Sequence, residues 1–104
     1  MNRKLVSSII NKTEGVRLDY FLLSTDREDF SGHFSTEYGI EIRQSPSDVF
    51  SVCPYLVSSV PDISCCKKDI EILIAELYVS HTDPSCLTEI IEDFIDCCPD
   101  KNSI

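Results

Sequence analysis

The sequence predicts a small α+β domain, in which a four-stranded antiparallel meander is followed by an antiparallel two-helix hairpin packed on one face of the sheet. Before Pro61, apolar residues mostly alternate with polar ones, as in strands, whereas after it they recur every three or four positions, as in helices. All predicted strands precede both predicted helices, which favours an α+β architecture over alternating strand–helix units. With 104 residues, the chain has the size of a single domain spanning residues 1–104.

The first two strands are predicted at residues 4–11 and 16–24, on either side of a turn with the sequence KTEG. In the second strand, one face is formed by apolar residues: Val16, Leu18, Tyr20 and Leu22. Phe21 and Leu23 lie on its other face, so we expect part of that face to be covered as well.

The third and fourth strands are predicted at residues 36–44 and 49–58. The third alternates between apolar and charged residues, with Tyr38, Ile40 and Ile42 on one face and Glu37, Glu41 and Arg43 on the other. The fourth contains Pro54, which cannot donate a hydrogen bond to a neighbouring strand and therefore indicates an edge or bulged strand. The connection at residues 26–35 is predicted to be a long loop.

The first predicted helix begins with Ser64 as its N-terminal cap and runs to about Ser80. Its core stripe is Cys66, Ile70, Leu73, Ile74 and Leu77, widened by Ile72, Ala75 and Val79, so we expect burial over most of its girth. Because four strands and one helix do not cover so apolar a helix completely, a homodimer formed through it is an alternative.

The second predicted helix begins at Asp83 and Pro84, an acidic cap followed by the residue favoured at the first helical position, and it stops at Pro99. Its apolar residues recur at helical spacing: Leu87, Ile90, Ile91, Phe94, Ile95 and Cys98. The opposite face is acidic and consists of Glu89, Glu92, Asp93 and Asp96.

The net charge of −9 comes entirely from the last third of the chain. From Asp69 to Asp100 there are nine acidic residues and no lysine or arginine, whereas the remainder carries nine residues of each sign. Such a surface repels a phosphate backbone, which argues against nucleic-acid binding, and attracts a partner protein with a basic surface. The acidic row Glu89, Glu92, Asp93 and Asp96 is therefore either a solvated helix face or a docking surface.

The six cysteines include two adjacent pairs, Cys65–Cys66 and Cys97–Cys98. The chain has neither an export signal nor an apolar stretch long enough to cross a membrane, so we expect a cytoplasmic protein with reduced thiols. Two antiparallel helices of similar length would nevertheless bring the pairs together, where four thiols can bind zinc or form a disulfide. The simpler interpretation places Cys66 and Cys98 in the core as small apolar residues, with Cys65 and Cys97 at its rim.

A thiol nucleophile is suggested by His81, Asp83 and Cys86, which occur together in the stretch SHTDPSC. Asp83 is already explained as a helix cap, and His81 as a cation near the end of the preceding helix, so catalysis is not favoured. The sequence has no P-loop, dinucleotide fingerprint, G-x-S-x-G or H-E-x-x-H motif. We therefore expect neither an enzyme nor a cofactor, with zinc as the alternative.

Three stretches, TEYGIEIRQ, VPDISCCKKDIEILIAEL and DPSCLTEIIEDFID, together resemble a family of small uncharacterised proteins from clostridial-type Gram-positive bacteria, described as a domain of unknown function. The matching elements are Tyr38–Ile42, Asp62–Ser64, and Leu87 with Ile91–Ile95. The resemblance implies a small cytoplasmic bacterial protein. It brings no catalytic residues, and the cysteine pairs are not part of the family pattern.

Together these features predict a small cytoplasmic interaction or regulatory module with an acidic docking helix. The alternative is a thiol redox or zinc-binding protein that uses Cys65, Cys66, Cys97 and Cys98. The first hypothesis depends on the segregation of charge, and the second on the meeting of the two cysteine pairs.

Overall fold

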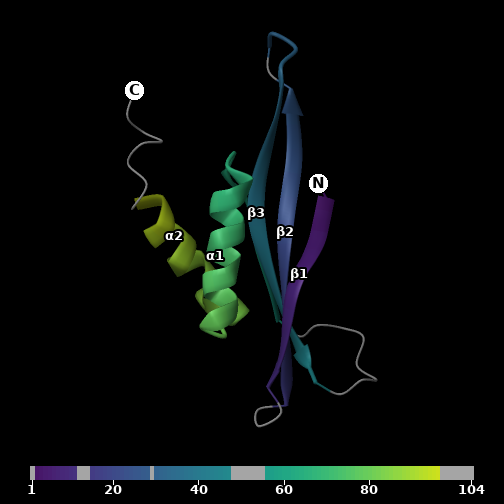
Figure 1. Cartoon of the computed structure of the whole chain (residues 1–104), viewed down its shortest axis with the longest axis vertical. Coiled ribbons are helices and arrows are strands. Elements are labelled where there is room, and N and C mark those ends of the chain that lie inside the picture. Colours follow the sequence, from purple (N-terminus) through teal and green to yellow (C-terminus); the bar gives the residue numbers. More distant parts are fainter. Residues whose placement is uncertain (1, 12–14, 29, 48–55, 97–104) are drawn as a thin grey trace.

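Every strand of the sheet pairs with the next one in the sequence. The computed structural model describes residues 2–11, 15–28, 30–47 and 56–96. The strands β1 (Asn2–Asn11), β2 (Val16–Glu28), β3 (Phe34–Pro46) and β4 (Leu56–Ser64) form one antiparallel sheet in the order β1-β2-β3-β4. The helices α1 (Lys67–Val79) and α2 (Leu87–Asp96), joined through the 3₁₀ turn η1 (Pro84–Cys86), lie on one side of this sheet (Figure 1). The predicted α+β meander with a helical hairpin is confirmed.

The β2–β3 hairpin is longer than predicted and projects beyond the helices (Figure 1). β2 continues to Glu28 and β3 already begins at Phe34, so the long loop expected at residues 26–35 is wrong. Polar side chains join the two strands there: the Thr36 hydroxyl donates to Asp26 over 2.7 Å. The large side chain of Phe34 remains exposed because neither α1 nor α2 reaches this end of the hairpin (Figure 1).

The described part of β4 begins at Leu56, and the predicted start at residue 49 lies with Pro54 outside the described residues. The strand continues to Ser64, so its predicted end at residue 58 is wrong. The edge position expected for this strand is confirmed, because β4 ends the sheet. Its pairing with β3 is irregular beside Gly39, where an added Cβ would lie only 2.6 Å from the Cα of Pro61. Only glycine therefore fits at position 39.

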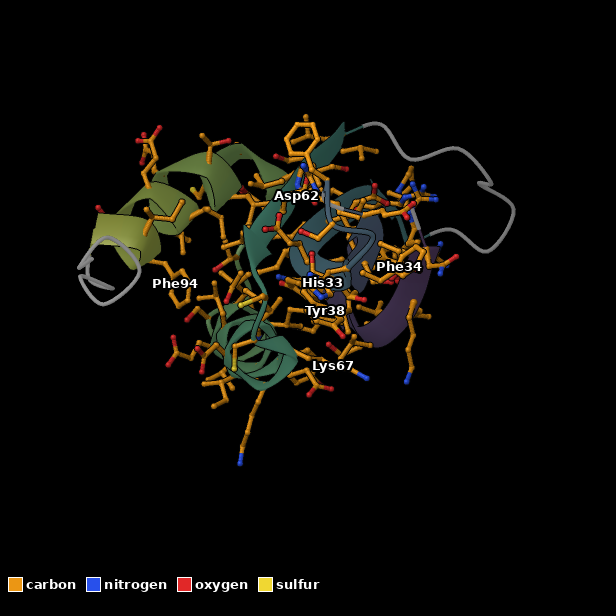
Figure 2. All side chains as sticks on the ribbon, turned by 90° about the horizontal axis from the view of Figure 1, so that it is seen from above. His33, Phe34, Tyr38, Asp62, Lys67 and Phe94 are labelled. Carbon is orange, nitrogen blue, oxygen red and sulfur yellow. The ribbon has the colours of Figure 1, made fainter. Side chains whose placement is uncertain are left out.

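The hydrophobic core fills the space between one face of the sheet and the helices. This face, which we call the helix face, carries Leu18, Tyr20, Leu22, Ile40 and Ile42. α1 lies against β2 and β3, and α2 lies against β4. Figure 2 shows Phe94 pointing from α2 toward α1. The two helices contribute six buried residues to the core: Ile70, Leu73, Ile74, Leu77, Leu87 and Ile91.

Three predictions about α1 are wrong. The helix starts at Lys67 with Cys66 at the cap position, and the Ser64 hydroxyl accepts a hydrogen bond from the Cys66 backbone N–H instead of capping the helix. Cys66 itself is exposed, not part of the core. The residues expected to widen the core stripe, Ile72, Ala75 and Val79, are exposed as well, because they point away from the sheet.

Candidate functional site

The acidic row of α2 is presented to solvent by a well-anchored helix. Leu87 and Ile91 are buried against the sheet, and the opposite side of α2 carries Glu89, Glu92 and Asp93, all exposed. None of these three carboxylates takes part in the ion pairs found among the described residues. Asp96 is the last residue of α2, and its side chain lies outside the description.

The outer side of α1 is apolar, unlike that of α2. Ile72, Ala75 and Val79 line a shallow surface hollow of about 380 Å³, together with Glu76 and Ser80. These positions are spaced three and four residues apart, so they form one stripe on the side of α1 opposite its core residues. A homodimer through α1, which the sequence offered as an alternative, would use this stripe.

The cysteine pairs are only half within the described structure. Cys65 and Cys66 are exposed free thiols just before α1, whereas Cys97 and Cys98 lie outside the described residues, so the expected meeting of the pairs stays a prediction. Among the residues that are described, no three histidine, cysteine or acidic side chains are grouped to bind a metal.

The segment with His81, Asp83 and Cys86 forms the connection between α1 and α2. His81 has a left-handed backbone with φ of 53°, and the N–H groups of His81 and Thr82 donate to Tyr78 and Leu77, which closes the end of α1. Asp83 caps η1 by accepting from the Ser85 backbone N–H over 3.0 Å. The side-chain contact of Cys86 is with the Ser85 hydroxyl, 3.8 Å from its sulfur, and not with His81.

A small cavity of about 60 Å³ lies beside this junction. Its wall combines apolar strand residues with four polar side chains: Asn11, Gln44, His81 and Asp83. The space is sufficient for a few water molecules but too small for a typical organic ligand.

The sheet face opposite the helices, which we call the open face, contains a buried carboxylate that sequence reasoning missed. Glu41 is 3% exposed, and its two oxygens accept from Arg3 over 2.8 Å, from Arg43 over 2.7 Å and from the Ser59 hydroxyl over 2.6 Å. Both guanidinium groups also lie over the Phe21 ring, 5.9 Å and 5.2 Å from its centroid. The cluster explains why the second face of β2 is partly covered, as expected from Phe21 and Leu23.

The protonation of Glu41 follows from these contacts. Burial by itself raises the pKa of a carboxyl, but the hydrogen bonds from Ser59 and Arg43 and the charges of Arg43 and Arg3 outweigh this effect and lower the pKa of Glu41. Glu41 is therefore a permanently charged anchor for two arginines, not a group that exchanges protons near neutral pH.

The arginines and the acidic row of α2 lie on opposite sides of the sheet. All four arginines of the chain are on the open face, and each one pairs with a carboxylate: Arg3 and Arg43 with Glu41, Arg17 with Asp19, and Arg27 with Glu37 and Asp62. Within the described part of the chain, Glu89, Glu92 and Asp93 of α2 have no such partner. The arginines are thus separated in space from the acidic row, whereas Lys67 and Lys68, in the first turn of α1, lie on the same side of the sheet as α2.

A family model described as a family of unknown function (DUF6514) matches residues 2–97. No curated protein and no solved structure matches the chain. Of the helices in the described part of the chain, none combines the length and the apolar character that crossing a membrane requires.

Proposed function

The chain belongs to this family of unknown function, and we propose that it is a cytoplasmic interaction module that docks a partner protein with a basic surface through α2. The docking surface consists of Glu89, Glu92 and Asp93, with Asp96 at the end of the same helix. The proposed role is binding, and it requires neither a catalytic group nor a cofactor.

One observation carries this proposal: three exposed carboxylates lie side by side on α2, and none of them forms an ion pair with a cation of the described residues. Residues three and four positions apart on a helix are neighbours, so their negative charges repel each other in the free protein. A basic partner relieves this repulsion and gains attraction to all three groups, which raises the association rate as well as the specificity. The anchoring of α2 through Leu87 and Ile91 holds the row in one geometry, so little order has to be gained on binding.

The test compares two double variants that change the net charge equally. Glu89→Lys/Glu92→Lys reverses charge on α2, and Glu71→Lys/Glu76→Lys reverses charge on α1, where both glutamates are also exposed. A lysine-rich helical peptide serves as the probe, with its glutamate counterpart as the negative control, and affinity is measured by calorimetry at low and physiological salt. We expect the α2 variant to bind at least about tenfold more weakly, and the α1 variant to bind almost normally.

Equal weakening by both double variants would show that only the overall charge matters and would overturn the proposal. The two double variants are also compared by cross-linking in cells, which extends the test from the probe peptide to the natural partner. There the α2 variant should lose a partner that the α1 variant retains.

A second candidate function is supported by the exposure of Cys66. The simple explanation of this cysteine, a small apolar residue in the core, does not hold for an exposed side chain. Cys65 and Cys66 lie directly before α1 and are both open to solvent, so a metal ion or an oxidant can reach their sulfur atoms. A free-thiol count and a zinc assay on freshly purified protein test this alternative, and six reactive thiols without metal would exclude it.

A further inference from the structure

The two edges of the sheet differ in how they are protected. β4 forms one edge, where α2 packs against the strand, Pro61 interrupts it and its pairing with β3 is irregular. β1 forms the other edge and has ten residues, no proline and exposed apolar side chains at Leu5, Val6 and Ile10. A long edge strand of this kind offers its outward backbone N–H and C=O groups to another strand.

We propose that β1 pairs with β1 of a second copy of the chain, antiparallel, to give a homodimer with a continuous eight-stranded sheet. This inference is independent of the acidic docking surface on α2. The register that pairs the whole of β1 with itself places Asn2 opposite Asn11 of the second copy, with the two-fold axis between Val6 and Ser7. Such an interface is isologous and closes on itself, so assembly stops at the dimer.

The irregularity in the middle of β1 makes this register possible. Side chains of neighbouring residues in a regular strand point to alternate faces of the sheet. If a regular strand with an even number of residues pairs along its whole length with a second copy of itself, related by a two-fold axis perpendicular to the sheet, the two residues of each pair point to different faces. In β1 the pairing with β2 shifts between Leu5 and Ser7, so that Leu5 and Ser8 lie opposite Phe21 and Asp19 on the same open face.

The shift brings the opposing pairs on both sides of the two-fold axis onto a common face: Asn2 with Asn11, Arg3 with Ile10, Lys4 with Ile9, and Leu5 with Ser8. On the open face, Arg3 meets Ile10 of the second copy, and Leu5 meets its Ser8. On the helix face, Lys4 meets Ile9 of the second copy. Because the direction of the backbone N–H groups follows the same alternation as the side chains, the hydrogen-bonding groups of the two strands are aligned as well.

The distribution of charge on β1 favours the same register. Both of its cations, Arg3 and Lys4, are at its start, and antiparallel pairing places each of them opposite an isoleucine instead of another cation. Ile10 is 57% exposed in the single chain, and its neighbours across the new strand pair are Arg3 and, diagonally, Leu5 of the second copy. The apolar stem of Arg3 is already held in place by the pairing of its guanidinium with Glu41, so the surface that receives Ile10 is preformed.

The test is the molar mass in solution over a range of concentrations, measured by light scattering and sedimentation, for the full chain and three variants. Ile10→Lys places a lysine opposite Arg3 of the second copy, and we expect the dimer dissociation constant to rise at least about tenfold. Ile10→Glu places an acid opposite the same arginine, and we expect the dimer to be retained or tightened. Ile72→Lys is the matched control, since Ile72 on α1 is 51% exposed and receives the same substitution.

Three results would overturn the proposal: a monomer at all concentrations, equal effects of the lysine and glutamate at position 10, or a dimer that only Ile72→Lys disrupts. Because Ile10 also lies opposite Arg17 within its own sheet, the thermal stability of each variant is recorded at a concentration where the chain is monomeric. Amide hydrogen exchange provides a second readout that needs no substitution. Dimerisation through β1 predicts that amides of this strand become protected as the concentration rises, while those of α1 do not change.

Discussion

Replacing Glu41 with glutamine should destabilise the fold and remove part of its sensitivity to acid. The substitution keeps the shape of the side chain but removes the charge that Arg3, Arg43 and Ser59 approach. Hydrogen bonds to charged groups contribute about 1.5–3 kcal/mol, and breaking a fully buried ion pair costs about 3–5 kcal/mol. Because the side chains of Arg3 and Arg43 remain 45% and 31% exposed, solvent screens the loss, and we expect a cost near the lower range, about 2 kcal/mol.

The pH dependence has a definite sign. Folding lowers the pKa of Glu41, so the charged carboxylate contributes stability above the pKa of an unfolded glutamate, about 4.3, and loses it as the pH falls through the folded-state value. The difference in unfolding free energy between the wild type and Glu41→Gln should therefore be full at neutral pH and shrink toward pH 3.

Urea unfolding followed by circular dichroism at several pH values measures this difference. In thermal unfolding at neutral pH, the melting temperature of Glu41→Gln should lie roughly 10 °C below that of the wild type, the shift expected for about 2 kcal/mol in a domain of this size. Asp19→Asn is the matched control, because it is the same acid-to-amide change on the same face, but Asp19 pairs with one arginine, Arg17. A cost for Glu41→Gln below about 0.5 kcal/mol, or one equal at pH 7 and pH 3, would refute the reasoning.

Three further predictions concern single backbone or side-chain positions. Gly39→Ala should cost about 3 kcal/mol or more in urea unfolding, because its Cβ would collide with the backbone at Pro61, and a smaller cost would show that β4 can shift. His81→Gly should raise the unfolding free energy by about 1 kcal/mol, because glycine adopts the left-handed conformation without strain, and a loss instead would reveal a contact of the imidazole. Tyr20→Phe should cost about 1 kcal/mol through the lost 2.8 Å hydrogen bond to the Thr82 carbonyl. Burial, together with the charge of Asp83 and the nearby Tyr78, raises the pKa of Tyr20 to about 12, so wild-type stability should fall between about pH 10 and 12, a loss that the Tyr20→Phe variant should lack.

The strand–helix order and the inward residues were readable from the sequence because both follow from local periodicity. Ile40 and Ile42 alternate with charged residues, and Ile70, Leu73, Ile74 and Leu77 recur at helical spacing; all of them are buried. The limits of the β2–β3 hairpin were not readable in this way. Asp26 and Thr36 have no apolar signal, and they lie in strands because they pair with each other across the hairpin, where the Thr36 hydroxyl donates to the Asp26 carboxylate.

The sides of α1 and the state of Glu41 depend on tertiary structure. Apolar residues surround most of α1, and periodicity alone does not tell which of them the sheet covers; the sheet reaches Ile70 and Ile74 but leaves Ile72 exposed. The alternation in β3 places Glu41 on a polar face, which by itself indicates solvent. Its burial comes from Arg3, 38 positions away in the sequence, and this pairing follows only from the strand order.

For the candidate site, the sequence identified the acidic row of α2 but not its relation to the arginines. Spacing alone placed Glu89, Glu92 and Asp93 on one helix face, and all three are exposed. That every arginine lies on the opposite side of the molecule is a consequence of strand register, which a one-residue slip would reverse.

The overhang of the β2–β3 hairpin has a consequence for how the molecule opens. Near Tyr20 and Ile42 the two strands are held by side chains of both the sheet and α1, whereas beyond Ser24 they are held mainly by each other. Opening the distal part exposes little apolar surface, so it requires far less free energy than unfolding the core. We therefore expect the β2–β3 hairpin to belong to two cooperative units. Its distal part opens locally, whereas its part near Tyr20 and Ile42 opens only when the whole domain unfolds.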